Sequence, residues 1–306
     1  MELGQLRAFV QVIDQGGFTA AARHMGVSQS TLSAQIGRLE DALDMMLFDR
    51  SGRGVVLTDA GEVLAPRARA LLQDAWSIES ELMSAVREGC VELRIGAIPT
   101  VSGFLMASVI EGLVERMPRI RVSFEEAPTE DLVRMIETGS IHGALMARVG
   151  SVGKLEQRVI GEERLVLAGA KGDGVFERGC LDLEDIRKRG IISLDEVHCL
   201  GEQTRNWCLD RGLEGSIRCR ATQLGTMMTL IEDGVGISLV PEMVVATSGD
   251  GKLRYREARP ECPTRTIVLC SKPGAALPGA MKDVESLAKA RMGALLESAR
   301  GMIGGA

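Results

Sequence analysis

The order of helical patterns in the first 58 residues is the feature that most constrains the fold. Apolar residues recur at helical spacing over residues 3–15, and a pair of glycines ends that pattern. A short second helix should run from an N-cap at Thr19 to a stop at Gly26, and Ser28 should cap a third helix over QSTLSAQIGRLEDAL. Two short helices joined by a tight turn predict a helix-turn-helix.

The third predicted helix should present small hydrogen-bonding side chains on its outer face. Its apolar residues, from Leu32 to Leu43, form an inward stripe. Polar side chains near the start of such a helix can approach phosphates and base edges in the major groove of DNA, and a hairpin predicted over 47–58 could add phosphate contacts. The alternative is a three-helix domain whose polar faces are only solvated. The candidate DNA contacts are Gln29, Ser30, Thr31, Ser33, Arg38, Arg50 and Arg53.

A long helical pattern follows, from an N-cap at Thr58 to about residue 86. Its apolar residues alternate steps of four and three, which is the spacing of a short coiled coil. An amphipathic helix packed on its own domain is the alternative. We favour dimerisation, because a dimer would present two recognition helices to successive half-sites. The predicted dimer contacts are Leu64, Leu71, Ile78 and Leu82.

Beyond this helix, short apolar runs alternate with helical patterns, which predicts an α/β sheet. A second unit should begin near Arg164 and the chain should return near Thr266, giving two lobes with a cleft between them. Ligands in such folds bind beyond the carboxyl ends of parallel strands. Thr100 and Thr129 could both face that cleft. Thr129 could instead be only an N-cap, and Thr100 only a turn residue after a proline.

Composition limits the other classes of protein. No run of 18 apolar residues appears, and the N-terminus carries an acid where a signal peptide would carry positive charge, so we expect a cytoplasmic protein away from membranes. Seven cysteines without a C-x-x-C pair argue against a secreted disulfide framework and a zinc site. Three histidines lack metal spacing and no G-x-S-x-G occurs. We therefore expect no metal, no cofactor and no enzyme.

Two cysteines, Cys199 and Cys208, bracket a short segment of the second half. A disulfide needs Cα atoms roughly 5.5–6 Å apart, whereas nine steps of helix would separate them by roughly 13 Å. If the segment is helical when reduced, bond formation must unwind it. Taken alone, such cysteines are more often buried than reactive, and a reactive thiol needs nearby positive charge. The candidate cations are His198, Arg205, Arg220 and Arg265.

The N-terminal segment resembles the winged helix-turn-helix of the LysR-type regulators. The resemblance rests on FTAAARHMGVSQSTLSAQIGRLEDAL, on the following LFDR and on LTDAGE. It departs at Ala34 and Gly37, where many members carry basic residues, so phosphate contacts should be absent there. Sequence-specific binding would then depend more on Gln29, Ser30, Ser33 and the wing.

The second half resembles the hydrogen-peroxide-sensing members of the same family, so that the resemblance spans essentially the whole chain. It rests on IPTVSGFL, EEAPTEDL, HCLGEQ, RATQL and GVGISLVP and on Cys208. It implies that Cys199 is the peroxidatic thiol, that Cys208 resolves it, and that Thr100, Thr129 and His198 help to hold the peroxide. Departures are Gly201, where a basic residue is familiar, and five further cysteines, of which Cys219 could compete as the resolving thiol.

The fold class expected from these observations is an α+β multidomain chain with three parts. They are a winged helix-turn-helix over 1–58, a coiled-coil linker helix over 59–88, and a two-lobed α/β periplasmic-binding-protein-like sensor domain over 89–306. Lobe I should take about 89–163 and 266–300, and lobe II about 164–265.

The leading functional hypothesis is a peroxide-sensing transcriptional regulator. Its expected partners are double-stranded promoter DNA, hydrogen peroxide, RNA polymerase, a thiol reductant system and further copies of itself, as a dimer or tetramer. One alternative is a LysR-type regulator that senses a small metabolite in the interlobe cleft with inert cysteines. The other is a thiol peroxidase, which would not need the N-terminal helices.

Overall fold

A computed structural model describes residues 1–49, 55–83, 91–148, 150, 155–177, 180–248, 251–259, 261–274 and 277–303. The chain divides into two compact units. The first comprises Met1–Gly89 and Glu137–Ser140, and the second comprises Cys90–Ile136 and Ile141–Ala306. Among the described residues, no helix has the length and apolarity needed to cross a membrane.

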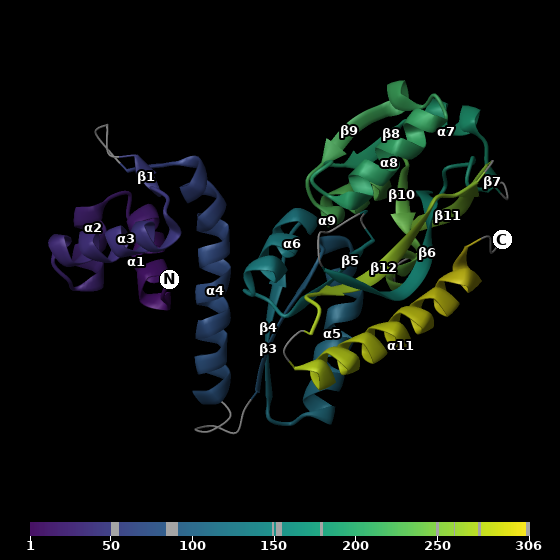
Figure 1. Ribbon diagram of the computed structural model, residues 1–306. Helices are drawn as coiled ribbons and strands as arrows, with labels where there is room; N and C mark the ends of the chain where they lie inside the picture. The colour runs from purple at the N-terminus through teal and green to yellow at the C-terminus, as the bar shows by residue number, and fades with distance from the viewer. Residues whose placement is uncertain are drawn as a thin grey trace. The chain divides into compact units, whose positions relative to one another are not determined.

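The N-terminal unit is a three-helix module followed by a two-stranded hairpin and a long helix (Figure 1). Its elements are α1 (Leu3–Asp14), α2 (Phe18–Met25), α3 (Gln29–Leu43), β1 (Phe48–Asp49), β2 (Val56–Leu57) and α4 (Asp59–Met83). The inward stripe of α3 packs on α1 around Phe9, and Phe48 of the hairpin closes this core with its ring centroid 5.2 Å from that of Phe9. The predicted helix-turn-helix with its hairpin is therefore present.

Most of the predicted helix boundaries in this unit are confirmed by their caps. Ser28 Oγ accepts a hydrogen bond of 3.0 Å from Thr31 N, and Gly26 ends α2 with a φ of 67°, a conformation that favours glycine. Thr58 Oγ1 accepts from Gly61 N at 3.1 Å, as expected at the start of α4. The Thr19 cap is wrong, because α2 already begins at Phe18; Thr19 Oγ1 instead donates to a glutamine side chain of α3 at 3.1 Å.

The C-terminal unit contains one large mixed sheet and one small parallel sheet. The large sheet has the order β4-β3-β5-β12-β6-β11-β7, with β10 paired to β6, and the small sheet joins β8 to β9. The strands are β3 (Val91–Ala97), β4 (Ile120–Glu126), β5 (Gly143–Ala147), β6 (Glu156–Ala170), β7 (Cys180–Leu181), β8 (Ile191–Leu194), β9 (Ile217–Ala221), β10 (Ser238–Pro241), β11 (Leu253–Ala258) and β12 (Thr264–Ser271). The helices are α5 (Pro99–Arg116), α6 (Thr129–Thr138), α7 (Leu183–Arg189), α8 (Cys199–Asp210), α9 (Leu224–Glu232), α10 (Glu242–Thr247) and α11 (Pro278–Met302), with a 3-10 turn at Glu214–Ser216.

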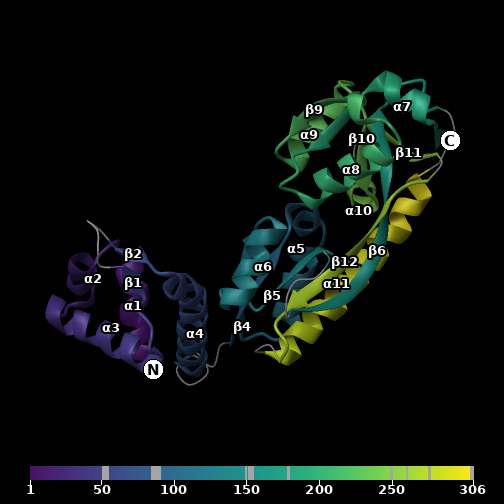
Figure 2. The same cartoon turned by 45° about the horizontal axis from the view of Figure 1, so that its top comes forward.

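Two apolar cores define two lobes within this unit. One core gathers around β3, β5, β12 and α5, and the other around β8, β10 and α8. Strand β6 serves both, since Ile160 lies in the first core and Leu165 in the second. The second unit predicted to begin near Arg164 therefore begins in the middle of a continuous strand. Figure 2 shows β6, β12 and α11 running from one lobe to the other, so these elements tie the lobes together.

Candidate functional site

Cys199 and Cys208 lie at opposite ends of α8, in the second lobe. Cys199 is the first residue of this helix, directly after the N-cap residue His198, and both cysteines are free thiols. Nine residues of α-helix rise by roughly 13 Å and turn through about two and a half revolutions, so the two side chains leave opposite faces. The segment is therefore helical while both thiols are free, which is the conformation in which a disulfide between them is predicted to be impossible.

Gly201 allows the first turn of α8 to pack against the end of β8. A Cβ at this position would lie 2.3 Å from Asp195 O and 2.5 Å from Leu194 O, which are backbone atoms. A side chain cannot fit there unless the backbone moves. In this conformation, position 201 therefore requires a glycine.

Cys199 meets two polar groups from the first lobe. Its half-buried side chain packs against the core of that lobe, although α8 belongs to the other. Thr100 stands in the first turn of α5 and Arg265 near the start of β12, and both are buried. Arg265 Nη1 donates to Thr100 Oγ1 at 2.9 Å and Nη2 donates to Thr100 O at 3.1 Å. The structure therefore brings Cys199, Thr100 and Arg265 together.

Glu163 holds Arg265 in place. The two residues face each other across the antiparallel pair of β6 and β12, and both side chains are fully buried. Glu163 Oε1 accepts from Arg265 Nε at 2.9 Å, and Oε2 accepts from Met243 N at 3.0 Å. A buried guanidinium needs such a partner, because an unpaired charge in the interior costs several kcal/mol. Sequence reasoning missed Glu163, since only the register of β6 against β12 reveals the pair.

The pKa of Cys199 reflects competition between burial and these polar groups. Burial raises the pKa of Cys199 above its ordinary value. The charge of Arg265 and hydrogen bonds from Thr100, from Leu200 N and from Arg265 oppose that rise without cancelling it. The resting site therefore holds a protonated thiol next to a fixed cation and donors that would stabilise an anion formed there.

Cys208 has no comparable environment. It is fully buried in the core of the second lobe, and burial raises its pKa to about 11, opposed only by the charge of Arg211. The neighbouring Trp207 fixes this end of α8, since its Nε1 donates to Glu261 O at 3.2 Å and the Arg211 guanidinium lies 4.9 Å from its ring centroid. Cys208 is thus shielded while α8 remains intact.

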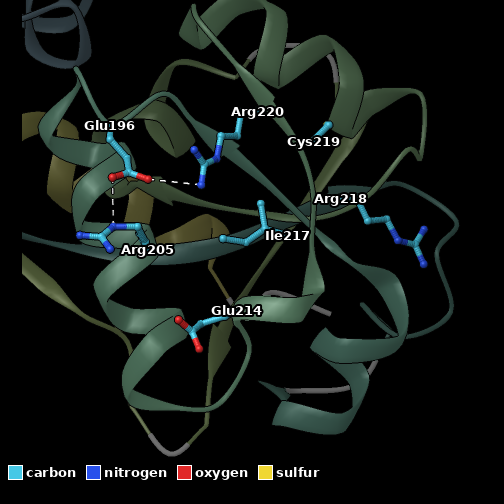
Figure 3. A pocket seen from close by; sticks show the side chains of 7 residues that line it. All are labelled: Glu196, Arg205, Glu214, Ile217, Arg218, Cys219 and Arg220. Carbon is cyan, nitrogen blue, oxygen red and sulfur yellow. Dashed lines mark ion pairs between the residues drawn. The ribbon is translucent and has the colours of Figure 1, made fainter.

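The other predicted cations are engaged elsewhere. His198 Nε2 donates to Thr222 O at 2.9 Å, so its ring is bound to the strand-to-helix loop after β9. Arg205 Nε and Arg220 Nη2 both pair with Glu196, at 3.1 Å and 3.3 Å (Figure 3). Glu196 and its two arginine partners line a cavity of about 470 Å³, together with Glu214, Ile217, Arg218 and Cys219. Of the four candidate cations, Arg265 is the one beside Cys199.

Thr100 and Thr129 stand at the same edge of the large sheet. Strands β3 and β4 are parallel neighbours, and each is followed by a helix whose first turn holds one of these threonines. Thr100 belongs to the first turn of α5, so it is no simple turn residue. Thr129 is itself the first residue of α6, and its buried Oγ1 has no hydrogen-bond partner among the described residues. Its predicted role as an N-cap is therefore wrong, and its hydroxyl is left available.

The candidate DNA contacts lie on one helix and one hairpin. Gln29, Ser30, Thr31 and Arg38 are exposed on α3, whereas Ser33 is half-buried. The Ser28 hydroxyl contacts those of Ser30 and Thr31 at 2.8 Å and 2.7 Å, which pre-orders the start of the helix. Arg50 and Arg53 lie outside the described residues.

The predicted dimer contacts along α4 fall into two groups. Leu64 packs against the core of its own unit, as does the fully buried Ala68, so the first turns of α4 stabilise the three-helix module. Leu71 and Ile78 are 46% and 59% exposed. The side chain of Leu82 is outside the described part of the structure. Apolar surface is thus presented farther along the helix.

Among the described residues, no group of three or more His, Cys, Asp or Glu side chains is placed to hold a metal ion.

Comparison with known proteins places both units in one family. Residues 3–62 match the family described as bacterial regulatory helix-turn-helix protein, lysR family, and residues 87–293 match the LysR substrate binding domain. The second match alone covers more than half of the chain.

Curated relatives and solved structures agree with these matches. The chain is 30% identical to the DNA-binding transcriptional dual regulator OxyR of Escherichia coli K12 over 95% of this chain and 96% of the relative. It is 29% identical to the hydrogen peroxide-inducible genes activator of Haemophilus influenzae, over 97% and 99% of the two chains. It also resembles a solved structure of a cysteine mutant of Corynebacterium glutamicum OxyR with bound H2O2, with 25% identity, a TM-score of 0.63 and coverage of 98% and 95%. The chain therefore belongs to the LysR family of bacterial regulatory helix-turn-helix proteins, and within that family it is OxyR-like.

Proposed function

We propose that this protein is a peroxide-sensing transcriptional regulator, switched by a reversible disulfide between Cys199 and Cys208. The observation that carries the proposal is the placement of Cys199 beside Thr100 and Arg265, at the start of the helix whose other end holds Cys208. The relatives of this chain include hydrogen peroxide-inducible genes activators, and this supports the choice of oxidant.

The first chemical step is attack of the Cys199 thiolate on one peroxide oxygen. The O–O bond breaks, the sulfur is oxidised to a sulfenic acid, and the departing hydroxide takes up a proton and leaves as water. Arg265 and Thr100 stabilise the negative charge as it passes from sulfur to the departing oxygen. Thr129, whose buried hydroxyl has no partner among the described residues, is the next residue proposed for the peroxide site. His198, directly before Cys199, is also proposed for it and would have to give up its hydrogen bond to Thr222 O to reach the peroxide.

The second step joins the two sulfurs. The Cys208 thiolate attacks the sulfenic sulfur, and the hydroxyl group leaves as water. Because α8 holds the two side chains on opposite faces, the helix must unwind between them. In the chain-entropy model, a bond that closes a loop of about ten residues stabilises the folded chain relative to the unfolded chain by roughly 2.7 kcal/mol. The lost packing around Trp207 offsets much of this gain, and such a near balance keeps the switch reversible.

The N-terminal unit supplies the proposed output. Binding to double-stranded promoter DNA would use α3 and the hairpin, with dimers formed through the exposed apolar residues of α4 and a tetramer as the expected assembly. RNA polymerase and a cytoplasmic thiol reductant system are the further proposed partners. The proposed DNA contacts are Gln29, Ser30, Thr31, Ser33, Arg38, Arg50 and Arg53. The proposed dimer contacts are Leu71, Ile78 and Leu82, whereas Leu64 packs against the core of its own unit.

Footprinting on promoter DNA tests the DNA module and the thiol switch together. Peroxide should change the footprint of the natural protein, whereas the footprint of Cys199→Ser should stay the same as without peroxide. Cys270→Ser is the matched control, since that thiol is fully buried in β12 and should not affect switching. A Cys199→Ser protein that still switches would reject the proposal.

The proposal also holds that the protein is a regulator and not an enzyme. It predicts that each chain consumes peroxide once and then waits for slow reduction. Continuous peroxide turnover with a thiol reductant, at rates that match the first step, would instead support a thiol peroxidase.

A further inference from the structure

Helix α10 begins where β6 passes from one lobe to the other (Figure 2). Met243 in its first turn packs in the core of the first lobe, and the next residue, Val244, packs in that of the second. Strand β10 leads directly into α10, and its last residue, Pro241, is the partner of Leu165 on β6. Because these strands are antiparallel, the chain brings the first two residues of α10 beside residues 164 and 163 of β6.

Hydrogen bonds in both directions join these two pairs of residues. Glu242 Oε2 accepts from Arg164 N at 3.0 Å, and Oε1 accepts from Arg164 Nε at 2.9 Å. In the other direction, Glu163 Oε2 accepts from Met243 N at 3.0 Å. Both glutamates are buried. Met243 N belongs to the peptide that follows Glu242, so the residue whose side chain binds Arg164 also holds the peptide that binds Glu163.

The carboxylate of Glu163 connects these contacts to the Cys199 site. Its Oε1 lies 2.9 Å from Arg265 Nε and 2.8 Å from Nη2. A guanidinium is a rigid plane, so these contacts set the direction of Nη1, which donates to Thr100 Oγ1 at 2.9 Å. Rotation of the carboxylate would turn the guanidinium away from Thr100 and Cys199. The hydrogen bond from Met243 N to the second oxygen opposes that rotation.

We propose that Glu242 is a positioning residue for the attack of Cys199 on peroxide. It acts through the Met243 peptide, which steadies Glu163, and so through the orientation of Arg265. Arg164 in turn holds Glu242, since a buried carboxylate needs a paired cation. This role rests on the proposed function, because it concerns the same reaction.

The test compares two reagents on Cys199 in the full-length Cys208→Ser variant. Peroxide depends on Arg265 and Thr100 to stabilise the departing oxygen, whereas iodoacetamide depends on the thiolate fraction and on access. The ratio of the two rate constants therefore reports the alignment of Arg265. Trapping of the sulfenic acid with dimedone, followed by mass spectrometry of the Cys199 peptide, measures the peroxide rate, and carbamidomethylation of the same peptide measures the other.

Glu242→Gln should lower the ratio of peroxide to iodoacetamide rates. The amide keeps the size of the side chain but offers one acceptor oxygen where the carboxylate offers two, so a hydrogen bond from Arg164 is lost. Misplacement of a catalytic group by about 1 Å can slow a reaction roughly a hundredfold, and a partial misplacement should lower the ratio about tenfold. Arg164→Lys keeps the charge without the planar fork, so it should lower the ratio less, and it serves as the second variant if Glu242→Gln does not fold.

Two controls separate this role from a general loss of stability. Glu285→Gln makes the same change in an ion pair that joins Arg158 of β6 to α11, at 3.5 Å, and should leave the ratio unchanged. In a Glu163→Gln background the path to Arg265 is already broken. Adding Glu242→Gln there should lower the ratio no further, because the two changes act through one chain of contacts.

The outcomes distinguish this role from the proposed function. An unchanged ratio in folded Glu242→Gln, an equal fall in Glu285→Gln, or an additive fall in the Glu163→Gln background would overturn the role alone. If Cys199 in the Cys208→Ser protein reacts with peroxide no faster than free cysteine does, the proposed function and this role fail together. A lowered ratio in Glu242→Gln, combined with a natural protein whose DNA footprint ignores peroxide, would leave the role standing while the proposed function failed.

Discussion

The two ends of α8 carry the same side chain in opposite environments. At the first turn, Cys199 sits between the lobes beside a buried cation and hydrogen-bond donors. Near the last turn, Cys208 is enclosed by the apolar core of one lobe. Burial raises the pKa of both thiols, but hydrogen-bond donors and a cation oppose the rise at Cys199, whereas only the charge of Arg211 opposes it at Cys208. In the proposed mechanism, the surroundings of each cysteine, and not the cysteine spacing, would therefore assign attack to one end and resolution to the other.

The pH dependence of alkylation should show the largest contrast between the two ends. Because folding raises both pKa values above 9.0, each thiol is protonated at pH 7. Its rate with iodoacetamide should rise about tenfold per pH unit until the pH passes its pKa. Cys208 should reach its plateau only at about pH 11, and its rate at neutral pH should stay below that of Cys199, because Cys208 is fully buried whereas Cys199 is half-buried.

Stability should follow the same titration. The folded chain holds the Cys208 proton more tightly than the unfolded chain, so this contribution is fully present below pH 9.0 and is lost as the pH rises toward about 11. Mass spectrometry of single-cysteine variants measures the rates, and denaturant titration measures the stability. If the alkylation rates of Cys199 and Cys208 depended on pH in the same way, the proposed difference between the two ends of α8 would be contradicted.

Glu163→Gln sharpens the comparison at the Cys199 end. Loss of the buried carboxylate leaves the Arg265 charge uncompensated, which should lower the free energy of unfolding by about 3–5 kcal/mol. The same charge should also lower the pKa of Cys199, and each unit of decrease raises its thiolate fraction at neutral pH about tenfold. Alkylation of Cys199 should therefore accelerate while that of Cys208 in the folded protein does not. A slower Cys199 in a folded variant would contradict this account of Arg265.

The helix-turn-helix and its caps could be predicted because their signals are local. Ser28, Gly26 and Thr58 act on residues within one turn of themselves, so the sequence is sufficient to find them. The sequence could not show which of the four candidate cations lies beside Cys199. Arg265 is brought there by strand register, whereas the candidates nearer in sequence, Arg205 and His198, bind Glu196 and Thr222 O instead. The N-cap prediction for Thr129 failed because threonine is a common N-cap residue, whereas here the helix already includes Thr129 as its first residue.

Gly201→Ala tests the first turn of α8. The added Cβ would press on the backbone of Leu194 and Asp195, and overpacking of this kind costs about 1–3 kcal/mol. The reduced helical form would be weakened, so the Cys199 to Cys208 bond should form in more reducing glutathione buffers. Gly225→Ala is the matched control, because a Cβ there meets nothing within 4 Å. An identical redox midpoint in both variants would show that this turn does not oppose the bond.

Trp207→Phe tests the Cys208 end and should have the smallest effect. The ring is kept while the hydrogen bond to Glu261 O is lost, which costs the helical form about 1 kcal/mol. The reduction potential of the Cys199 to Cys208 pair should become more negative by about 20 mV. A shift in the opposite direction would mean that this contact survives, or strengthens, in the bridged form.

Hydrogen exchange along α8 tests the central claim that bond formation and an intact helix exclude each other. Amide protection between Cys199 and Cys208 is measured in the reduced protein and after peroxide treatment, with Cys199→Ser treated in parallel. The account predicts that protection collapses across this segment in the oxidised natural protein and persists in the variant. Full protection of α8 in a protein whose Cys199 and Cys208 are demonstrably bridged would contradict it.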